Sequence, residues 1–249
     1  MLLPYVERGH GRRLAFAHGF TQTKNSWNQI IDLLGPEFHS LSFDAPGHGD
    51  AAMLPFNCSE AAEAINNVAG DATYIGYSMG ARIMLHAAVQ FPEEVTSLVM
   101  VSGSPGLRSE TERGARVESD AKLADQIKEL GVAKFVDAWL DGPLFAGLND
   151  SNDQKEDRLG NTADGLIRSL KLCGTGAQES LWPALSSLNM PILLIVGELD
   201  SKFCDIGEQM KSMIGSNAQL EVVPGVGHSV HMEAPEIVSE LLRNFLATV

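Results

Sequence analysis

The pentapeptide Gly-Tyr-Ser-Met-Gly at residues 76–80 constrains the fold of this chain more than any other feature. It follows a β-rich run at 72–75 and precedes a helix-like run at 81–90. A serine at such a sharp strand-to-helix turn is held in a strained backbone conformation with its hydroxyl exposed, and the flanking glycines let the chain reverse without a collision. The pattern predicts a nucleophile elbow with Ser78 as its reactive residue, although the Gly-x-Ser-x-Gly spacing also occurs by chance in loops where the serine is only a turn residue.

Two other residues, both much later in the chain, can supply the base and the carboxylate that such a serine needs. A serine hydroxyl becomes reactive when a histidine takes its proton and a carboxylate orients that histidine. Asp200 follows the apolar run 191–196, beyond the carboxyl end of a predicted parallel strand, and His228 follows the strand-like run 219–223. The chain order Ser78, Asp200, His228 predicts a catalytic triad; the alternative is a turn-forming aspartate and an ordinary loop histidine.

His18-Gly19-Phe20 comes directly after the strand-like run 14–17. In an elbow-containing sheet this is the loop that supplies one backbone N–H to an oxyanion hole, and the residue after the nucleophile supplies the other. We therefore expect the N–H groups of Phe20 and Met79 to be the two donors. His18 itself is expected to be structural.

Alternating strand and helix patterns predict an α/β fold, with a mostly parallel sheet flanked by helices. The expected strands lie at about 13–17, 39–43, 72–77, 97–102, 191–197 and 219–223, and the expected helices near 26–34, 59–69, 79–91 and 234–247. The pattern becomes helix-like throughout between residues 104 and 189, most clearly at 117–130 and 132–140. We expect one core domain from 1–103 and 190–249, with 104–189 inserted as a helical lid, or cap.

Composition narrows the function further. A hydrophobic content of 44% is sufficient for a large core, and a net charge of −14 argues against nucleic acid or an anionic membrane as a partner. No signal peptide is apparent, and the apolar runs are of strand length, so we expect no membrane insertion. Three widely spaced cysteines fit reduced thiols in the cytoplasm. No phosphate loop follows the first strand and the histidines do not cluster, so we expect no cofactor and no metal.

Several blocks spread over nearly the whole chain resemble the MenH family, the 2-succinyl-6-hydroxy-2,4-cyclohexadiene-1-carboxylate (SHCHC) synthases of the α/β-hydrolase superfamily. The lid and loop blocks are more specific than the triad, which many unrelated hydrolases share. The blocks are Tyr-Ser-Met-Gly-Ala-Arg at 77–82, Ser-Pro-Gly-Leu at 104–107 with Glu-Arg-Gly-Ala-Arg at 112–116, Trp139 with Pro-Leu-Phe at 143–145, Gly-Glu-Leu-Asp-Ser-Lys-Phe at 197–203 and Gly-His-Ser-Val-His at 227–231.

The resemblance implies a lyase of menaquinone biosynthesis rather than a hydrolase. In this reaction an enolpyruvyl-bearing cyclohexene tricarboxylate (SEPHCHC) loses a ring proton and expels pyruvate, with the triad acting as a base. The alternative is a carboxylesterase or carbon–carbon bond hydrolase in which Ser78 is an acyl nucleophile; a small-ligand receptor on the same fold is a third interpretation. We expect a small anionic (polycarboxylate) substrate, and a monomer or weak homo-oligomer.

The resemblance also assigns substrate-binding residues. Arg82, Arg116 and Arg158 match the family's arginines, although Arg168 or Lys171 can replace Arg158, whose alignment crosses a loop of altered length. Fixed bidentate cations suit a polycarboxylate, and a cation in the first turn of the elbow helix opposes the helix dipole unless an anion offsets it. The alternatives are a solvent-facing Arg82 and an Arg116 that pairs with Glu112 or Glu118.

Two aromatic residues complete the expected site. Trp139 matches the family's lid tryptophan, and core packing is an equally good account of it. Tyr77, inside the elbow, is expected either to present its hydroxyl to the substrate or to pack in the core.

Overall fold

The computed structural model describes residues 2–249, and within that range seven strands form one sheet in the order β1-β3-β2-β4-β5-β6-β7. β1 is antiparallel to β3, and every other neighbouring pair is parallel. The strands are β1 (Tyr5–Arg8), β2 (Arg12–Ala17), β3 (Phe38–Phe43), β4 (Ala72–Tyr77), β5 (Val95–Val101), β6 (Ile192–Gly197) and β7 (Ala218–Val223).

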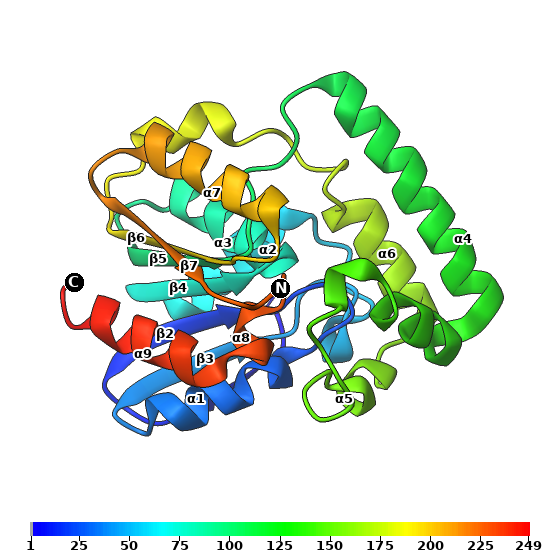
Figure 1. Ribbon diagram of the computed structural model, residues 1–249, viewed down its shortest axis with the longest axis horizontal. Coiled ribbons are helices and arrows are strands. Elements are labelled where there is room, and N and C mark those ends of the chain that lie inside the picture. The colour runs from blue at the N-terminus through cyan, green and yellow to red at the C-terminus, as the bar shows by residue number, and fades with distance from the viewer. Residues whose placement is uncertain (1) are drawn as a thin grey trace.

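Helices cover both faces of this sheet (Figure 1). On one face lie α2 (Cys58–Ala69), α3 (Met79–Gln90) and α7 (Ser201–Ile214), and on the other lie α1 (Asn28–Leu34) and α9 (Pro235–Leu246). The shorter helices are η1 (Lys24–Trp27), η2 (Gly49–Ala51), η4 (Trp182–Ser187) and α8 (Val230–Glu233). The mostly parallel sheet flanked by helices, as predicted, is the α/β-hydrolase architecture.

The alternation of side chains along β2 explains why both faces are covered. Successive side chains of a strand point to opposite faces of its sheet. Leu14 and Phe16 pack in the hydrophobic cluster beneath α1 and α9, whereas Ala15 and Ala17 pack in the cluster beneath α2 and α3. All four residues are buried, so neither face of the central sheet is open to solvent.

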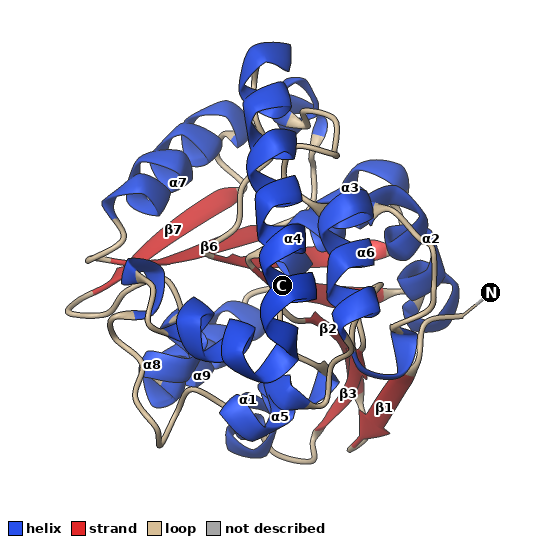
Figure 2. Cartoon of the chain, turned by 90° about the vertical axis from the view of Figure 1, so that its right-hand side faces the viewer, coloured by secondary structure: helices blue, strands red, loops and turns tan. Residues whose placement is uncertain are grey.

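The chain between β5 and β6 forms a separate group of helices beside the carboxyl ends of the strands (Figure 2). These helices are α4 (Glu110–Leu140), η3 (Pro143–Phe145), α5 (Lys155–Leu159) and α6 (Ala163–Cys173). α4 breaks at Gly131, whose φ of 73° and ψ of 168° are not helical, which separates the two pieces expected at 117–130 and 132–140. A small cluster that includes Ile127, Phe135 and Leu166 holds α4 against α6. The role of residues 104–189 as a lid stays a prediction.

Each expected strand and helix of the core is present within a few residues of its predicted bounds. The strand β1, the long helix α7 and the short helices η2 and α8 were not predicted. β1 is a short edge strand with mostly exposed residues, so it carries no hydrophobic run. α7 begins at Ser201, and its sequence is polar apart from a narrow buried stripe. That stripe includes Gly207, which packs against the side chain of Leu220 on β7. Within residues 2–249, no helix combines the length and the apolar character needed to cross a bilayer.

Candidate active site

Ser78 lies between the last residue of β4 and the first residue of α3, with φ of 50° and ψ of −106°. This conformation is strained for a residue with a side chain. The two elbow glycines make it possible, because a Cβ on Gly76 would lie 2.5 Å from the amide nitrogen of Ala81, and one on Gly80 would overlap the carbonyl oxygen of Ala17. The elbow predicted from the sequence is therefore present.

The side chains of Ser78, His228 and Asp200 form one chain of hydrogen bonds. Nδ1 of His228 lies 2.6 Å from Oδ2 of Asp200, and Nε2 lies 3.1 Å from Oγ of Ser78. Asp200 also caps α7, because its carboxylate accepts from the N–H of Phe203. In this arrangement His228 carries its proton on Nδ1, which leaves Nε2 free to accept the serine proton.

Three neighbours hold the loop that carries His228. The carboxylate of Glu233 accepts from the N–H of Gly227 at 2.7 Å and from the N–H of Ser229 at 3.1 Å. Ser102 donates its hydroxyl to the carbonyl of His228 at 2.7 Å, and the ring of Phe203 packs edge-on against the imidazole, with the ring centroids 4.6 Å apart. His228 is 3% exposed, so its ring is fixed before any ligand binds.

The N–H groups of Phe20 and Met79 are free to bind an anion, since neither donates a hydrogen bond to another group within residues 2–249. The buried His18 fixes the Phe20 amide. Its Nδ1 lies 2.8 Å from the carbonyl oxygen of Gly19, and its Nε2 accepts from the N–H of Ala45. Because the carbonyl and N–H of a trans peptide point in opposite directions, this contact turns the Phe20 N–H away from His18. His18 is structural, as expected.

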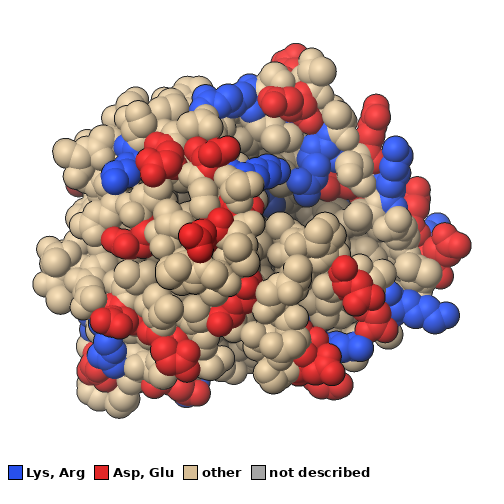
Figure 3. All heavy atoms as spheres, viewed as in Figure 1, with Lys and Arg blue, Asp and Glu red and all other residues tan. Residues whose placement is uncertain are grey.

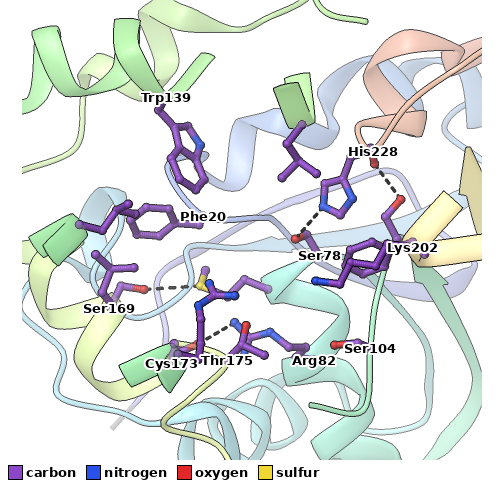
Figure 4. Close-up of a pocket in the computed structure, with 18 residues that line it drawn as sticks. Phe20, Ser78, Arg82, Ser104, Trp139, Ser169, Cys173, Thr175, Lys202 and His228 are labelled. Carbon is purple, nitrogen blue, oxygen red and sulfur yellow. Dashed lines mark hydrogen bonds between the residues drawn. The ribbon is translucent and has the colours of Figure 1, made fainter. Parts of the chain in front are cut away.

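A cavity of about 190 Å³ lies over Ser78 and His228 (Figure 4). Its charged lining residues are Arg82, Arg116 and Lys202, and no Asp or Glu is among the described residues that line it. In Figure 3, lysine and arginine side chains gather beside the hollow between the sheet domain and α4. The cavity thus has a cationic lining in a chain whose net charge is −14, and a potential of that sign attracts anions.

Arg82 contacts the carboxyl end of α6 directly, and Arg116 lies near it through Asp120, which packs against Gly174. Arg82 is 7% exposed and donates to the side chain of Gln178 at 2.5 Å and to the carbonyl of Cys173 at 2.6 Å, so it is not solvent-facing. Arg116 is half-buried and pairs through Nε with Asp120 at 2.7 Å. The partner is therefore Asp120 and not Glu112 or Glu118, the carboxylates considered as the alternative, and the same side chain also lines the cavity.

Comparison with known proteins identifies the family of this fold. The model of the alpha/beta hydrolase family matches residues 14–241. A Bacillus subtilis protein, named as a candidate 2-succinyl-6-hydroxy-2,4-cyclohexadiene-1-carboxylate synthase, is 36% identical over 247 residues, which cover 93% of this chain and 89% of its own. The synthase of that name from Enterobacter sp. (strain 638) is 31% identical, covering 94% of this chain and 91% of its own. A solved structure of MenH from S. aureus superposes with a TM-score of 0.92 at 26% identity, covering 98% of both chains.

The chain belongs to the MenH family of α/β-hydrolases. The family blocks that the sequence resembles bring several residues into one cavity: the triad residues Ser78 and His228, Arg82, Arg116 and Trp139. Trp139 packs in an aromatic group with Phe20 and Phe135 and also lines the cavity, so it takes part in the packing and its substrate contact stays a prediction. Its indole N–H has no partner within residues 2–249.

Two expected substrate contacts of this MenH-family protein are not at the cavity. Tyr77 is buried, and its hydroxyl lies 2.9 Å from that of Ser229, so it packs in the core and burial raises its pKa. Arg158 is 1% exposed and donates to the hydroxyl of Thr21 and to the carbonyl of Asp153. Arg158 therefore joins α5 to the loop after β2 instead of lining the cavity.

The substitutes considered for Arg158, namely Arg168 and Lys171, do not line the cavity either. The third cation of the lining is Lys202. It belongs to the family block at 197–203, but no role was predicted for it. Its position two residues after Asp200 was the signal that could have marked it. Within residues 2–249, no group of three or more His, Cys, Asp or Glu side chains is placed to hold a metal ion.

Proposed function

We propose that this MenH-family protein is the SHCHC synthase of menaquinone biosynthesis, which eliminates pyruvate from SEPHCHC. The observation that carries the proposal is the combination of a hydrogen-bonded Ser78–His228–Asp200 triad with a cavity whose charged lining is cationic. A neutral ester gives no reason for that lining. A tricarboxylate does, because charge-assisted hydrogen bonds contribute roughly 1.5–3 kcal/mol each.

The triad acts as a base in this mechanism. His228 takes the hydroxyl proton of Ser78 through Nε2 as the serine oxygen removes the ring proton of the substrate, so one proton moves from carbon to oxygen and one from oxygen to nitrogen. Asp200 stabilises the imidazolium that forms. The electron pair left on the ring shifts to expel the enolpyruvyl group, and the proton held by His228 returns to complete pyruvate.

The oxyanion hole stabilises the negative charge between these two steps. The free N–H groups of Phe20 and Met79 are directed donors that need no reorganisation when the charge appears. In other enzymes, the loss of one oxyanion-hole donor lowers the rate about 100- to 1000-fold. The close packing of Gly80 against the end of β2 keeps the two donors in a fixed relation.

Arg82, Arg116 and Trp139 bind the substrate. The arginines carry non-titrating charge for its carboxylates, and the indole of Trp139 packs against its ring. The helices of residues 104–189 act as a lid that excludes water, so the charge that develops at Ser78 is not dissipated by solvent. The enzyme works in the cytoplasm on a small soluble substrate, without nucleic acid.

The test measures pyruvate release and SHCHC formation from SEPHCHC that the preceding synthase makes in situ, beside hydrolysis of p-nitrophenyl butyrate. The proposal expects rapid SHCHC formation, feeble ester cleavage, and loss of SHCHC formation in both Ser78→Ala and Arg82→Ala. Good ester turnover without SHCHC formation would instead identify an esterase in which Ser78 is an acyl nucleophile.

A further inference from the structure

The cations of the cavity form two separate groups. Arg82 binds the carbonyl of Cys173, and Arg116 pairs with Asp120, whose carboxylate lies against Gly174. Both arginines are thus placed at the carboxyl end of α6. Lys202 comes from the first turn of α7 and lines the cavity next to Ser78 and His228, on the side away from Cys173 and Thr175 (Figure 4).

Lys202 has no carboxylate partner among the described residues. Within residues 2–249, no Asp or Glu oxygen lies within the 4.0 Å that defines an ion pair with its ammonium, although the chain has 32 acidic residues. Arg116 by contrast is already paired with Asp120. A cation in the first turn of a helix also opposes the helix dipole. An anion that enters the cavity is the group that would offset both effects.

The ammonium of Lys202 is linked to the triad through one aromatic ring. Its Nζ lies 5.7 Å from the centroid of the Phe203 ring, within the range of a cation–π contact, and that ring packs against His228. Lys202 is exposed at the cavity, whereas Arg82 is buried. A flexible, solvated ammonium suits a group that must be released, and a buried guanidinium suits a part of the ligand that stays fixed.

We infer that Lys202 binds the carboxylate of the pyruvyl group that leaves, and that Arg82 and Arg116 bind the carboxylates that remain on the ring product. This assignment rests on the proposed function. It makes Lys202 a determinant of specificity for substrates with an anionic leaving group, and it places departure of pyruvate on the Lys202 side of the cavity.

The test compares wild type, Lys202→Met and Lys202→Arg, with Lys211→Met as the matched control, because Lys211 is an exposed lysine of the same helix. KM for SEPHCHC and the inhibition constants of pyruvate and succinate are measured. In Lys202→Met we expect KM and the pyruvate constant to rise about 10- to 100-fold, while the succinate constant stays within about twofold of wild type. Lys202→Arg should recover most of the pyruvate affinity, and Lys211→Met should match wild type.

An unchanged pyruvate constant in Lys202→Met would overturn the inference. So would an equal loss of pyruvate and succinate affinity, because Lys202 would then attract any anion without selecting the leaving group. Calorimetric titration of pyruvate into Ser78→Ala and into Ser78→Ala/Lys202→Met gives a binding readout that needs no turnover. A wild-type enzyme that forms no SHCHC would refute the proposed function, whereas absence of pyruvate binding in Ser78→Ala would refute the role of Lys202.

Discussion

The carboxylate of Glu233 accepts hydrogen bonds from the peptide N–H groups on both sides of His228, at 2.7 and 3.1 Å. A glutamine in place of Glu233 can accept only one of these bonds, because its NH₂ group faces the second N–H. We expect Glu233→Gln to lower kcat about 10-fold or more through a misplaced imidazole, since small displacements at a reacting centre are costly. Steady-state kinetics with SEPHCHC would check this, with KM close to wild type.

The control for Glu233 is Glu236→Gln, an exposed carboxylate on α9. Surface substitutions of this kind usually change stability by less than about 0.5 kcal/mol, so we expect wild-type kcat. Equal kcat in Glu233→Gln and Glu236→Gln would show that the other contacts of the loop are sufficient to place His228.

Asp200→Asn separates the two tasks of Asp200. Asparagine still caps α7, because its side-chain oxygen accepts from the N–H of Phe203, so we expect little change in melting temperature. It no longer holds the Nδ1 proton of His228 in the required tautomer, a change that costs about 10⁴-fold in kcat in a serine protease. We expect a loss of similar order here, measured as single-turnover pyruvate release.

Ser78→Ala removes the proposed base while leaving the cavity lining intact. We expect kcat to fall by about 10²- to 10⁴-fold, the range that a positioned acid–base group contributes, with the dissociation constant of SHCHC within a few-fold of wild type. Stopped-flow turnover and calorimetric binding would check the two quantities. A Ser78→Ala variant that keeps most of its activity would show that Ser78 is not the base.

Arg82→Met tests a residue with a structural and a functional role. The substitution leaves the buried oxygens of Gln178 and Cys173 unpaired, so we expect the free energy of unfolding to fall by roughly 1–3 kcal/mol and KM to rise. Gln178→Leu removes one of those oxygens without removing the charge. Urea unfolding and KM measured for both variants would separate the roles, since only Arg82→Met should raise KM strongly.

The pH dependence of stability follows from four buried histidines. Burial lowers the pKa values of His18 and His48, and it lowers that of His86 to about 4 and that of His231 to about 3. Below pH 6.5 the unfolded chain binds protons that the folded chain excludes, so the free energy of unfolding falls as the pH drops from 6.5. The slope is about 1.4 kcal/mol per pH unit for each histidine that titrates only in the unfolded chain.

His86→Gln tests this dependence at one site, because His86 lies in α3 next to Arg82 and far along the helix from Ser78. Between pH 6.5 and 4.5 we expect this variant to lose stability with a smaller slope than wild type in urea unfolding. His10→Gln, at an exposed histidine, should keep the wild-type slope. Parallel curves for wild type and His86→Gln would contradict the prediction.

The elbow and its two partners were predictable because local sequence marks each of them. Ser78 lies between a strand run and a helix run, and Asp200 and His228 each follow a strand run that ends in a loop. The carboxyl ends of parallel strands meet at one edge of the sheet, so their chain order was sufficient to predict the contacts. Gly131 likewise lies between the two helical pieces predicted at 117–130 and 132–140. Glycine adopts a positive φ readily, and this conformation breaks α4 there.

The cavity lining beyond the elbow was less predictable. Arg158 lies at the end of a five-residue helix that follows Gln154, a residue in the left-handed conformation, and no sequence period fixes where such a helix directs its side chains. Its guanidinium meets Thr21 only through tertiary packing. Tyr77 lies in the core because it shares a face of β4 with Ile75, in the cluster beneath α1 and α9. Lys202 reaches the cavity through α7, a helix whose mostly polar sequence shows no clear apolar period.

The contact between Gly80 and the end of β2 has an evolutionary consequence. Any side chain at position 80 would overlap the backbone of Ala17, and backbone atoms cannot be exchanged for smaller ones. Selection for a new substrate therefore cannot act at this position. In a chain that keeps this elbow, new specificity can arise at side chains that surround the cavity without bearing on the turn, such as Arg116, Trp139 and Lys202.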